Sequence, residues 1–315
     1  MKVTEHLDRA TRPLISFEII PPKRGGAVSD LMRVVEDLAR YEPPFIDITS
    51  HPAEVVYKEA AEGYQKRIVR KRPGTLGICA LIQNKYNIDA VPHVLCRGFT
   101  QQETEDFLIE LRYLGIDNVL AIQGDDKGIR KKLEHGRTAN DYAVNLIQQI
   151  DAMNAGRYLE EQVDMSPTGF CIGAACYPEK HFESPNHPTD LRRTRAKVEA
   201  GAEYLVTQMF YENAHYFAFV ERCREAGVEV PIIPGVKVLT RRKHLTSIPK
   251  TFHCEIPREL SDEVEAADAS HIKEIGIQWA VRQVRELLEH GVPSVHIYTM
   301  LDSGVVARVV DSLGL

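Results

Sequence analysis

Two carboxylates in this sequence lie where short apolar runs could give them unusual chemistry. Glu18 lies within the run LISFEII, and Asp125 directly follows Gly124 at the end of NVLAIQG. A carboxylate among Ile and Phe side chains is partly desolvated, which raises its pKa toward the range of a proton donor at neutral pH. A glycine beside a carboxylate lets the backbone approach a ligand closely. Both are candidate catalytic groups, and a solvent-facing glutamate and a simple turn aspartate are the alternatives.

Hydroxyl, imidazole, amide and phenol groups end the other apolar runs, at Thr49, His93, Gln123, Tyr177, Gln208 and Tyr298. His93 follows Pro92 and could be a ligand, a base or a core histidine. His181 and His187 lie in YPEKHFESPNHP, but no neighbouring residues complete the spacing of a metal site. We therefore expect no bound metal.

The elements that must position these groups are eight apolar runs alternating with helix-like stretches, the pattern of parallel βα units. Glycines follow several of the helix-like stretches, where a left-handed residue commonly ends a helix. Eight repeats predict an α/β fold, a (β/α)8 TIM barrel, with the polar residues at the carboxyl ends of its strands, where barrel enzymes hold their catalytic groups. The expected strands are residues 14–20, 45–50, 90–96, 118–124, 170–176, 204–210, 231–236 and 294–300.

Three stretches depart from a regular repeat. Residues 75–87 form an extra segment before the third strand, and a long connection from Thr240 to about Ser270 separates strands seven and eight. The polar stretch 127–141 is expected to form a loop over the mouth of the barrel. An open doubly wound sheet is the competing fold, but no GxGxxG or GxxxxGK[ST] motif occurs, so the two common phosphate-binding loops are absent from the sequence.

Bulk properties indicate a soluble globular protein that can bury a substantial core. Its 315 residues suit one barrel domain spanning 1–315, with 43% hydrophobic and 27% charged residues. The net charge of −6, from 45 acidic and 39 basic side chains, gives no reason to expect nucleic acid or a membrane as partner. The sequence shows no signal-peptide core or membrane span, and its six scattered cysteines are expected to be reduced thiols. A cytoplasmic location follows.

Eight segments, in order along nearly the whole chain, resemble the methylenetetrahydrofolate reductase family. The first, SFEIIPPK, is similar to the FEFFPPK-type opening of that family. The others are IDITSHPAE, PHVLC, LGIDNVLAIQGD, IGAACYPEKH, KVEAGAEYLVTQMFY, IIPGV and VHIYTM.

This resemblance implies a (β/α)8 barrel with non-covalent FAD that reduces 5,10-methylenetetrahydrofolate to 5-methyltetrahydrofolate, using NADH or NADPH. Glu18 resembles the general acid of the family, Asp125 the carboxylate beside the flavin, and Gln208 the amide that contacts folate and nicotinamide in turn. Tyr298 joins these three as an implied substrate contact. The implied flavin contacts are Thr49, His93, Gln123, Gly124, Asp125, Thr138, Ala139, Tyr177, His181, Asp190 and Lys197.

The chain differs from the bacterial pattern at a few positions. Gln123 occupies the place of an arginine, Thr138 that of a tyrosine, and Leu301 and Asp302 that of an Asn-Arg pair. The length implies a catalytic barrel without the regulatory domain of eukaryotic members, and the family implies a homo-oligomer. Three other functions stay open: a barrel enzyme of folate methyl transfer, a flavoenzyme similar to proline dehydrogenase, and a non-catalytic barrel.

Overall fold

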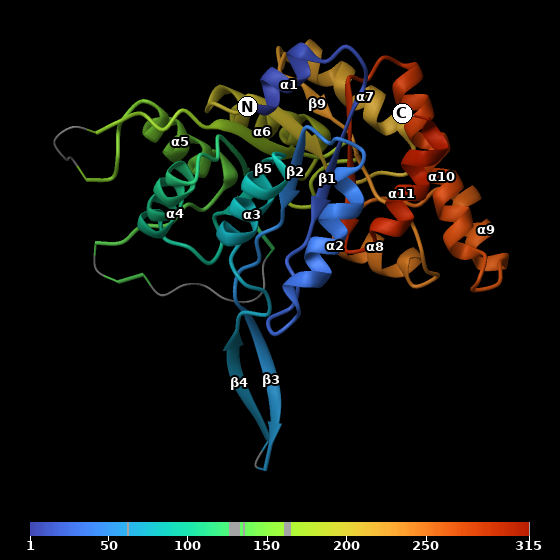
Figure 1. The fold of residues 1–315 in the computed structure, drawn as a ribbon, viewed down its shortest axis with the longest axis horizontal. Coiled ribbons are helices and arrows are strands. Elements are labelled where there is room, and N and C mark those ends of the chain that lie inside the picture. The colour runs from blue at the N-terminus through green and yellow to red at the C-terminus, as the bar shows by residue number, and fades with distance from the viewer. Residues whose placement is uncertain (62, 126–132, 135, 161–164, 315) are drawn as a thin grey trace.

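The computed structural model describes residues 1–315 except 62, 126–132, 135, 161–164 and 315. Its main sheet contains nine parallel strands in the order β10-β11-β1-β2-β5-β6-β7-β8-β9 (Figure 1). Eight successive positions of a barrel are filled, because β9 and β10 are two parts of one strand. The strands are β1 (Leu14–Ile19), β2 (Phe45–Ile48), β5 (Asp89–Leu95), β6 (Asn118–Ile122), β7 (Cys171–Cys176), β8 (Tyr204–Thr207), β9 (Ile232–Ile233), β10 (Gly235–Val236) and β11 (Ser294–Met300).

Pro234 joins the two ends of this sheet. It separates β9, which pairs with β8, from β10, which pairs with β11. The backbone N–H of His296 donates to the Pro234 carbonyl at 2.9 Å. The expected seventh strand therefore exists in two short parts, and the sheet curves into a nearly closed barrel. The prediction of an α/β barrel is confirmed.

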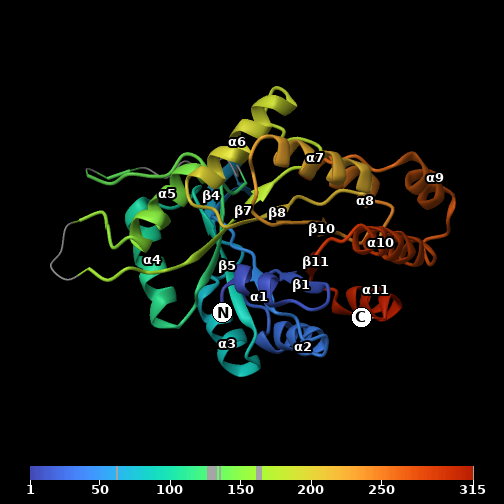
Figure 2. The ribbon, with the colours of Figure 1, turned by 90° about the horizontal axis from the view of Figure 1, so that it is seen from above.

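Helices surround the strands (Figure 2). One helix follows each strand up to β8, while three follow β10 in the long connection expected before the last strand. Helix α1 precedes the barrel. The helices are α1 (Val3–Arg9), α2 (Val28–Ala39), α3 (Leu76–Tyr86), α4 (Gln101–Tyr113), α5 (Ala143–Asn154), α6 (His187–Glu199), α7 (Asn213–Glu225), α8 (His244–Phe252), α9 (Arg258–Ala266), α10 (Ile272–Glu289) and α11 (Ser303–Leu313). No helix of the described residues is long and apolar enough to cross a bilayer.

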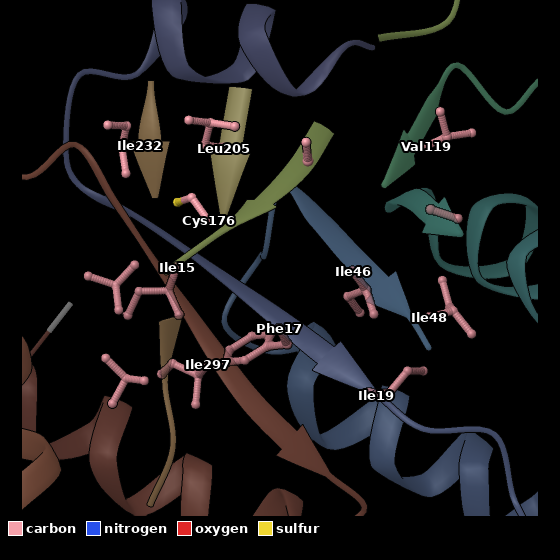
Figure 3. Packing of buried hydrophobic residues seen from close by; sticks show 14 of the residues in the cluster. Ile15, Phe17, Ile19, Ile46, Ile48, Val119, Cys176, Leu205, Ile232 and Ile297 are labelled. Atoms are coloured by element: carbon pink, nitrogen blue, oxygen red, sulfur yellow. The ribbon is translucent and has the colours of Figure 1, made fainter. Parts of the chain in front are cut away.

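Side-chain alternation along β1 separates the outer core from the barrel interior. Ile15, Phe17 and Ile19 belong to the large cluster between strands and helices (Figure 3). Because successive side chains of a strand point to opposite faces, Ser16 and Glu18 point into the barrel. Burying a side chain as large as Phe17 contributes roughly 1.5–3 kcal/mol. The outer face therefore fixes the orientation of β1, and with it the direction of Glu18.

Apolar side chains close the amino-terminal end of the barrel. Phe45, Val91 and Tyr204 form a second buried cluster there, and Val3 of α1 packs against it. The N–H of Val3 donates to Asn118 Oδ1 at 2.8 Å, which fixes α1 across this end. The barrel interior is consequently a packed apolar core at the amino-terminal ends of the strands and a polar site toward their carboxyl-terminal ends.

The elaboration before the third barrel strand differs from the expected one. Residues 76–86 are helix α3, which takes the regular place between β2 and β5. The extra element is an antiparallel hairpin of β3 (Glu54–Ala60) and β4 (Gly63–Val69), which projects from the body of the molecule (Figure 1). The prediction of an extra segment at 75–87 is therefore wrong, because the polar residues 58–67 have no apolar periodicity that would indicate strands. Of the loop expected at 127–141, residues 127–132 and 135 lie outside the described residues.

Candidate active site

Glu18 lies inside the barrel with 12% of its side chain exposed. Burial raises its pKa to about 7; His93 and Lys237 oppose this shift, whereas Asp47 adds to it. The alternative of a solvent-facing glutamate is therefore wrong. At neutral pH this carboxyl group is poised to hold and release a proton.

His93 of β5 lies between two carboxylates. Its Nε2 is 3.5 Å from Glu18 Oε2 and 3.5 Å from Asp47 Oδ2. Burial lowers the pKa of His93, although the Glu18 charge acts in the opposite direction. The histidine is thus buried in the barrel interior with its Nε2 directed at acids. Its expected contact with a flavin stays a prediction.

Asp47 of β2 is a buried site residue that the sequence reading missed. It is fully buried, and burial raises its pKa to about 7, with the nearby His296 opposing the shift. The available signal was a charged residue in the middle of the apolar run FIDI, the same signal that identified Glu18. Register pairs Glu18 with Asp47 on neighbouring strands, so the two inward carboxylates lie side by side.

Tyr298 and Lys237 complete this end of the interior. The Tyr298 hydroxyl donates to the Thr207 carbonyl at 2.6 Å, and Lys237 Nζ donates to the Tyr298 carbonyl at 2.9 Å. Burial lowers the pKa of Lys237 to about 8, which the Glu18 charge opposes. Gly235 leaves room for the phenol, because a Cβ there would lie 2.6 Å from the Tyr298 ring. The phenol is thereby fixed beside the acid.

Four of the expected flavin contacts gather at the end of β7 and on α6. The rings of Tyr177 and His181 meet edge to face at 4.4 Å, and Lys197 Nζ lies 5.7 Å from the Tyr177 ring centre. Lys197 Nζ also donates to the Ala175 carbonyl at 2.8 Å, and burial lowers its pKa. Asp190 accepts from the Ser184 hydroxyl at 2.8 Å. The group offers a cation, a carboxylate and aromatic faces together.

The segment after β6 carries the next three expected residues. Gly124 has a φ of +83°, a left-handed conformation that favours glycine, so the backbone turns sharply before Asp125. Arg97 holds this turn, since its N–H donates to the Gln123 carbonyl at 3.0 Å and its Nη1 to the Gly124 carbonyl at 3.3 Å. Asp125 is exposed, and its charge contributes to the raised pKa of Tyr177. Asp125 therefore lies within electrostatic reach of Tyr177.

The remaining expected contacts lie on separate elements. Thr138 donates from its hydroxyl to Gln101 Oε1 of α4 at 2.6 Å, and half-buried Ala139 follows it. Thr49 follows β2, and its buried hydroxyl has no hydrogen-bond partner in the structure. Gln208 follows β8, and its side-chain carbonyl accepts from the Met209 N–H at 2.9 Å. The structure thus brings some of the expected flavin contacts together and leaves Thr138 apart from them, at the start of α4.

The arrangement combines a proton donor inside the strands with polar groups on the following segments. No group of His, Cys, Asp and Glu among the described residues could hold a metal ion. The chemistry available to these side chains is proton donation, charge stabilisation and hydrogen bonding. Such a division is typical of the class of (β/α)8-barrel proteins that bind ligands at the carboxyl ends of their strands.

Comparison with known proteins refines this class. The model of the family described as methylenetetrahydrofolate reductase matches residues 2–314, so the chain belongs to that family. A probable methylenetetrahydrofolate reductase (NADPH) of Caenorhabditis elegans is 29% identical over 314 residues, which are 99% of this chain and 44% of that protein. The 5,10-methylenetetrahydrofolate reductase of Salmonella typhimurium is 27% identical, covering 96% of this chain and 90% of its own.

The chain spans about half the length of the first curated relatives it matches, between 44% and 51%. Among solved structures, an uncharacterized protein from Clostridium thermocellum that binds 5-methyl-5,6,7,8-tetrahydrofolic acid superposes with a TM-score of 0.57 at 13% identity. The superposition covers 99% of this chain and all of that one. At this identity the likeness shows the shared fold.

Proposed function

We propose that residues 1–315 form one FAD-binding catalytic domain that reduces 5,10-methylenetetrahydrofolate to 5-methyltetrahydrofolate with NADH or NADPH. The observation that carries this proposal is Glu18, a carboxylic acid inside the barrel whose pKa is raised by burial to about 7. Family membership supports the choice of reaction. Reduction of this substrate needs an acid, because its five-membered ring must open before the methylene carbon can accept hydride.

The residues present fit a non-covalent flavin. Thr49 has a buried hydroxyl without a partner, which a ligand could satisfy. Tyr177, His181, Asp190 and Lys197 would hold the flavin beside β7, and Gln123, Gly124, Thr138 and Ala139 would contact it from the loop after β6. His93 would contact it from within the barrel. When bound, FAD supplies the hydride chemistry, accepting from the nicotinamide and donating to the folate carbon.

Glu18 gives its proton to the departing N10 of the folate ring, directly or through a water. Its raised pKa means that a large fraction is protonated near pH 7, so the donor is ready when the substrate binds. Ring opening then leaves an iminium cation on the folate. Asp125, close enough to influence Tyr177, stabilises that cation by its negative charge.

Gln208 and Tyr298 orient the substrate. The carbonyl of the Gln208 amide is held by the Met209 N–H, so its NH2 group is the part that faces a ligand. Tyr298 is fixed by its hydrogen bond to the Thr207 carbonyl and pairs in register with Glu18 on the neighbouring strand. A neutral amide suits a position where nicotinamide and folate alternate, because it imposes no charge on either.

An anaerobic absorbance titration tests this function. The purified protein should carry a yellow flavin that denaturation releases, and NADH or NADPH should bleach it. Methylenetetrahydrofolate should then restore the absorbance, with 5-methyltetrahydrofolate as product. A methyl-transfer barrel would need no flavin, a relative of proline dehydrogenase would be bleached by proline but not by a nicotinamide, and a non-catalytic barrel would do neither. Any of these three outcomes rejects the proposal.

The chain further acts as a homo-oligomer, with the β3–β4 hairpin as a contact between copies. An isolated two-stranded hairpin is at best marginally stable in water. Register places Tyr57, Tyr64 and Ile68 on one face of it, and they are 67%, 75% and 65% exposed. Light scattering should show that Tyr57→Ser with Tyr64→Ser weakens self-association. A monomeric wild type, or unchanged assembly of the variant, contradicts this.

The location proposed is the cytoplasm. All six cysteines are buried and unpaired. Free thiols persist in a reducing compartment, whereas oxidising compartments favour disulfides. Cell fractionation with a reductase assay would check the assignment.

A further inference from the structure

The barrel interior holds a carboxylate that the proposed reaction does not use. Asp47 is fully buried, and neither of its side-chain oxygens has a hydrogen-bond partner. A buried carboxylate without such partners is costly, because burial removes the water that would stabilise its charge. Asp47 therefore reduces the stability of the barrel unless its charge or its proton is shared with a neighbour.

The neighbour is the imidazole of His93. Its Nε2 lies 3.5 Å from Asp47 Oδ2 and 3.5 Å from Glu18 Oε2, so one ring nitrogen serves two acids. A single N–H at that nitrogen can donate well to only one of them at a time. The two carboxyl groups consequently compete for the same donor, and as like charges they resist being ionised together.

Asp47 and Glu18 have different titratable groups around them. Asp47 faces His296 of β11 as well as His93, and the Nε2 of His296 has no hydrogen-bond partner of its own. Cys79, Tyr204 and Tyr298 are its other titratable neighbours. Glu18 faces Lys237 and Tyr298 in addition to His93 and Asp47. His93 and Lys237 favour the Glu18 anion, whereas the charge of Asp47 favours the protonated form of Glu18.

We propose that Asp47 is a positioning residue that, by repelling charge from Glu18 and drawing the His93 N–H to itself, keeps the acid proton on Glu18 up to neutral pH. This inference rests on the proposed function, since it concerns the same acid. Glu18 transfers the proton to the folate nitrogen and becomes a carboxylate. Solvent protonates it again at the mouth of the barrel, and Asp47 sets the pH at which that protonation is complete.

Asp47→Asn tests the inference, because the amide keeps the shape and removes the charge. Without the repulsion, and with His93 free to stabilise the Glu18 anion, Glu18 should lose its proton at lower pH. We expect the alkaline limb of the folate half-reaction to move down by about one pH unit or more. At pH values above that limb the folate half-reaction of the variant should be about tenfold slower than that of the wild type. At low pH the two rates should be the same. Flavin reduction by the nicotinamide should be unchanged throughout.

The measurement is stopped-flow reoxidation of the reduced holoenzyme by methylenetetrahydrofolate from about pH 5.5 to about pH 9. Asp8→Asn is the matched control, because Asp8 is exposed on α1 at the opposite end of the barrel. Asp47→Ser supplies a second uncharged variant if the asparagine variant does not fold. An unshifted limb overturns the inference, as does equal slowing at every pH, which would indicate a structural role.

A second readout uses the flavin-free protein. The infrared band of the protonated Glu18 carboxyl, assigned by its loss in Glu18→Gln, should titrate at lower pH in Asp47→Asn than in the wild type. An identical titration rejects the role of Asp47 whether or not the reaction is the proposed one. Conversely, a wild type without flavin, or one that methylenetetrahydrofolate cannot reoxidise, rejects the proposed function and leaves the infrared result to stand alone.

Discussion

The barrel interior and the rim above it hold similar polar residues in different surroundings. Glu18 and His93 lie on strands, are nearly buried, and have their directions fixed by outward neighbours such as Phe17. Asp125 and Thr138 lie on the segments after β6 and are exposed. Charges interact far more strongly in the poorly polarisable interior than at a wet surface. The comparison suggests that interior residues determine whether the reaction occurs, whereas rim residues tune it.

Glu18→Gln should give the largest effect. A carboxamide cannot donate the proton needed for ring opening, so flavin reoxidation by methylenetetrahydrofolate should fall by about 10²–10⁴-fold. Flavin reduction by the nicotinamide needs no such acid and should survive largely intact. Stopped-flow traces of the two half-reactions measure both rates. Equal slowing of both would mean that Glu18 supports the barrel or the flavin, and the contrast between interior and rim would lose its main example.

Asp125→Asn should give a smaller but still large effect. The change removes the negative charge that we propose stabilises the folate cation while preserving shape, and loss of one electrostatic partner costs on the order of 10²-fold in rate. Asp106→Asn, on the exposed side of α4, is the control for the same substitution. The folate half-reaction reports the difference. An unchanged rate would remove Asp125 from the mechanism and make the rim less important than proposed.

The sequence predicts some features of the site and not others. Period-two alternation along LISFEII directs Glu18 inward, so its burial is readable from neighbours in the chain. The same alternation in FIDI would have identified Asp47, which lies in the family-like segment IDITSHPAE, although the resemblance implied a role only for Thr49 there. The partners His93 and His296 come from strands distant in sequence, and the shared Nε2 depends on the register of β1, β2 and β5, which no local pattern contains.

The strands also differ in how well the sequence predicts them. Eight barrel positions were predictable because buried parallel strands read as continuous apolar runs. The split of the seventh strand at Pro234 was not predicted, although proline cannot donate a ladder hydrogen bond. The β3–β4 hairpin was not predicted because none of the residues in its two strands is fully buried, so its sequence carries no buried face.

Gly173→Ala probes the packing beneath the acid. A Cβ at this position of β7 would lie 2.3 Å from the ring of fully buried Tyr204, which has no room to withdraw. Overpacking of this kind typically costs about 1–3 kcal/mol in the free energy of unfolding. Gly77→Ala on α3 is the control, because nothing lies within 4 Å of its Cβ, and it should cost nothing. Urea denaturation midpoints compare the two. Equal stability of the two variants would mean that the barrel interior packs too loosely to hold the side chains of the site in fixed positions.

Thr138→Ala should have the smallest effect and tests the rim directly. The Thr138 hydroxyl is exposed and already donates to Gln101 Oε1, so a flavin contact there would replace one hydrogen bond by another. A neutral hydrogen bond at an exposed site contributes about 1 kcal/mol at most, which corresponds to about a fivefold change in the Kd for FAD. Fluorescence titration of the flavin-free protein with FAD measures this constant.

Lys197→Met is the variant to compare with Thr138→Ala. Burial of the Lys197 ammonium makes every hydrogen bond it forms stronger, so its loss should weaken FAD binding more than tenfold. A Thr138 effect as large as that of Lys197 would mean that the segment after β6 is ordered around the flavin as firmly as the strands are, and the distinction between interior and rim would then fail at the cofactor.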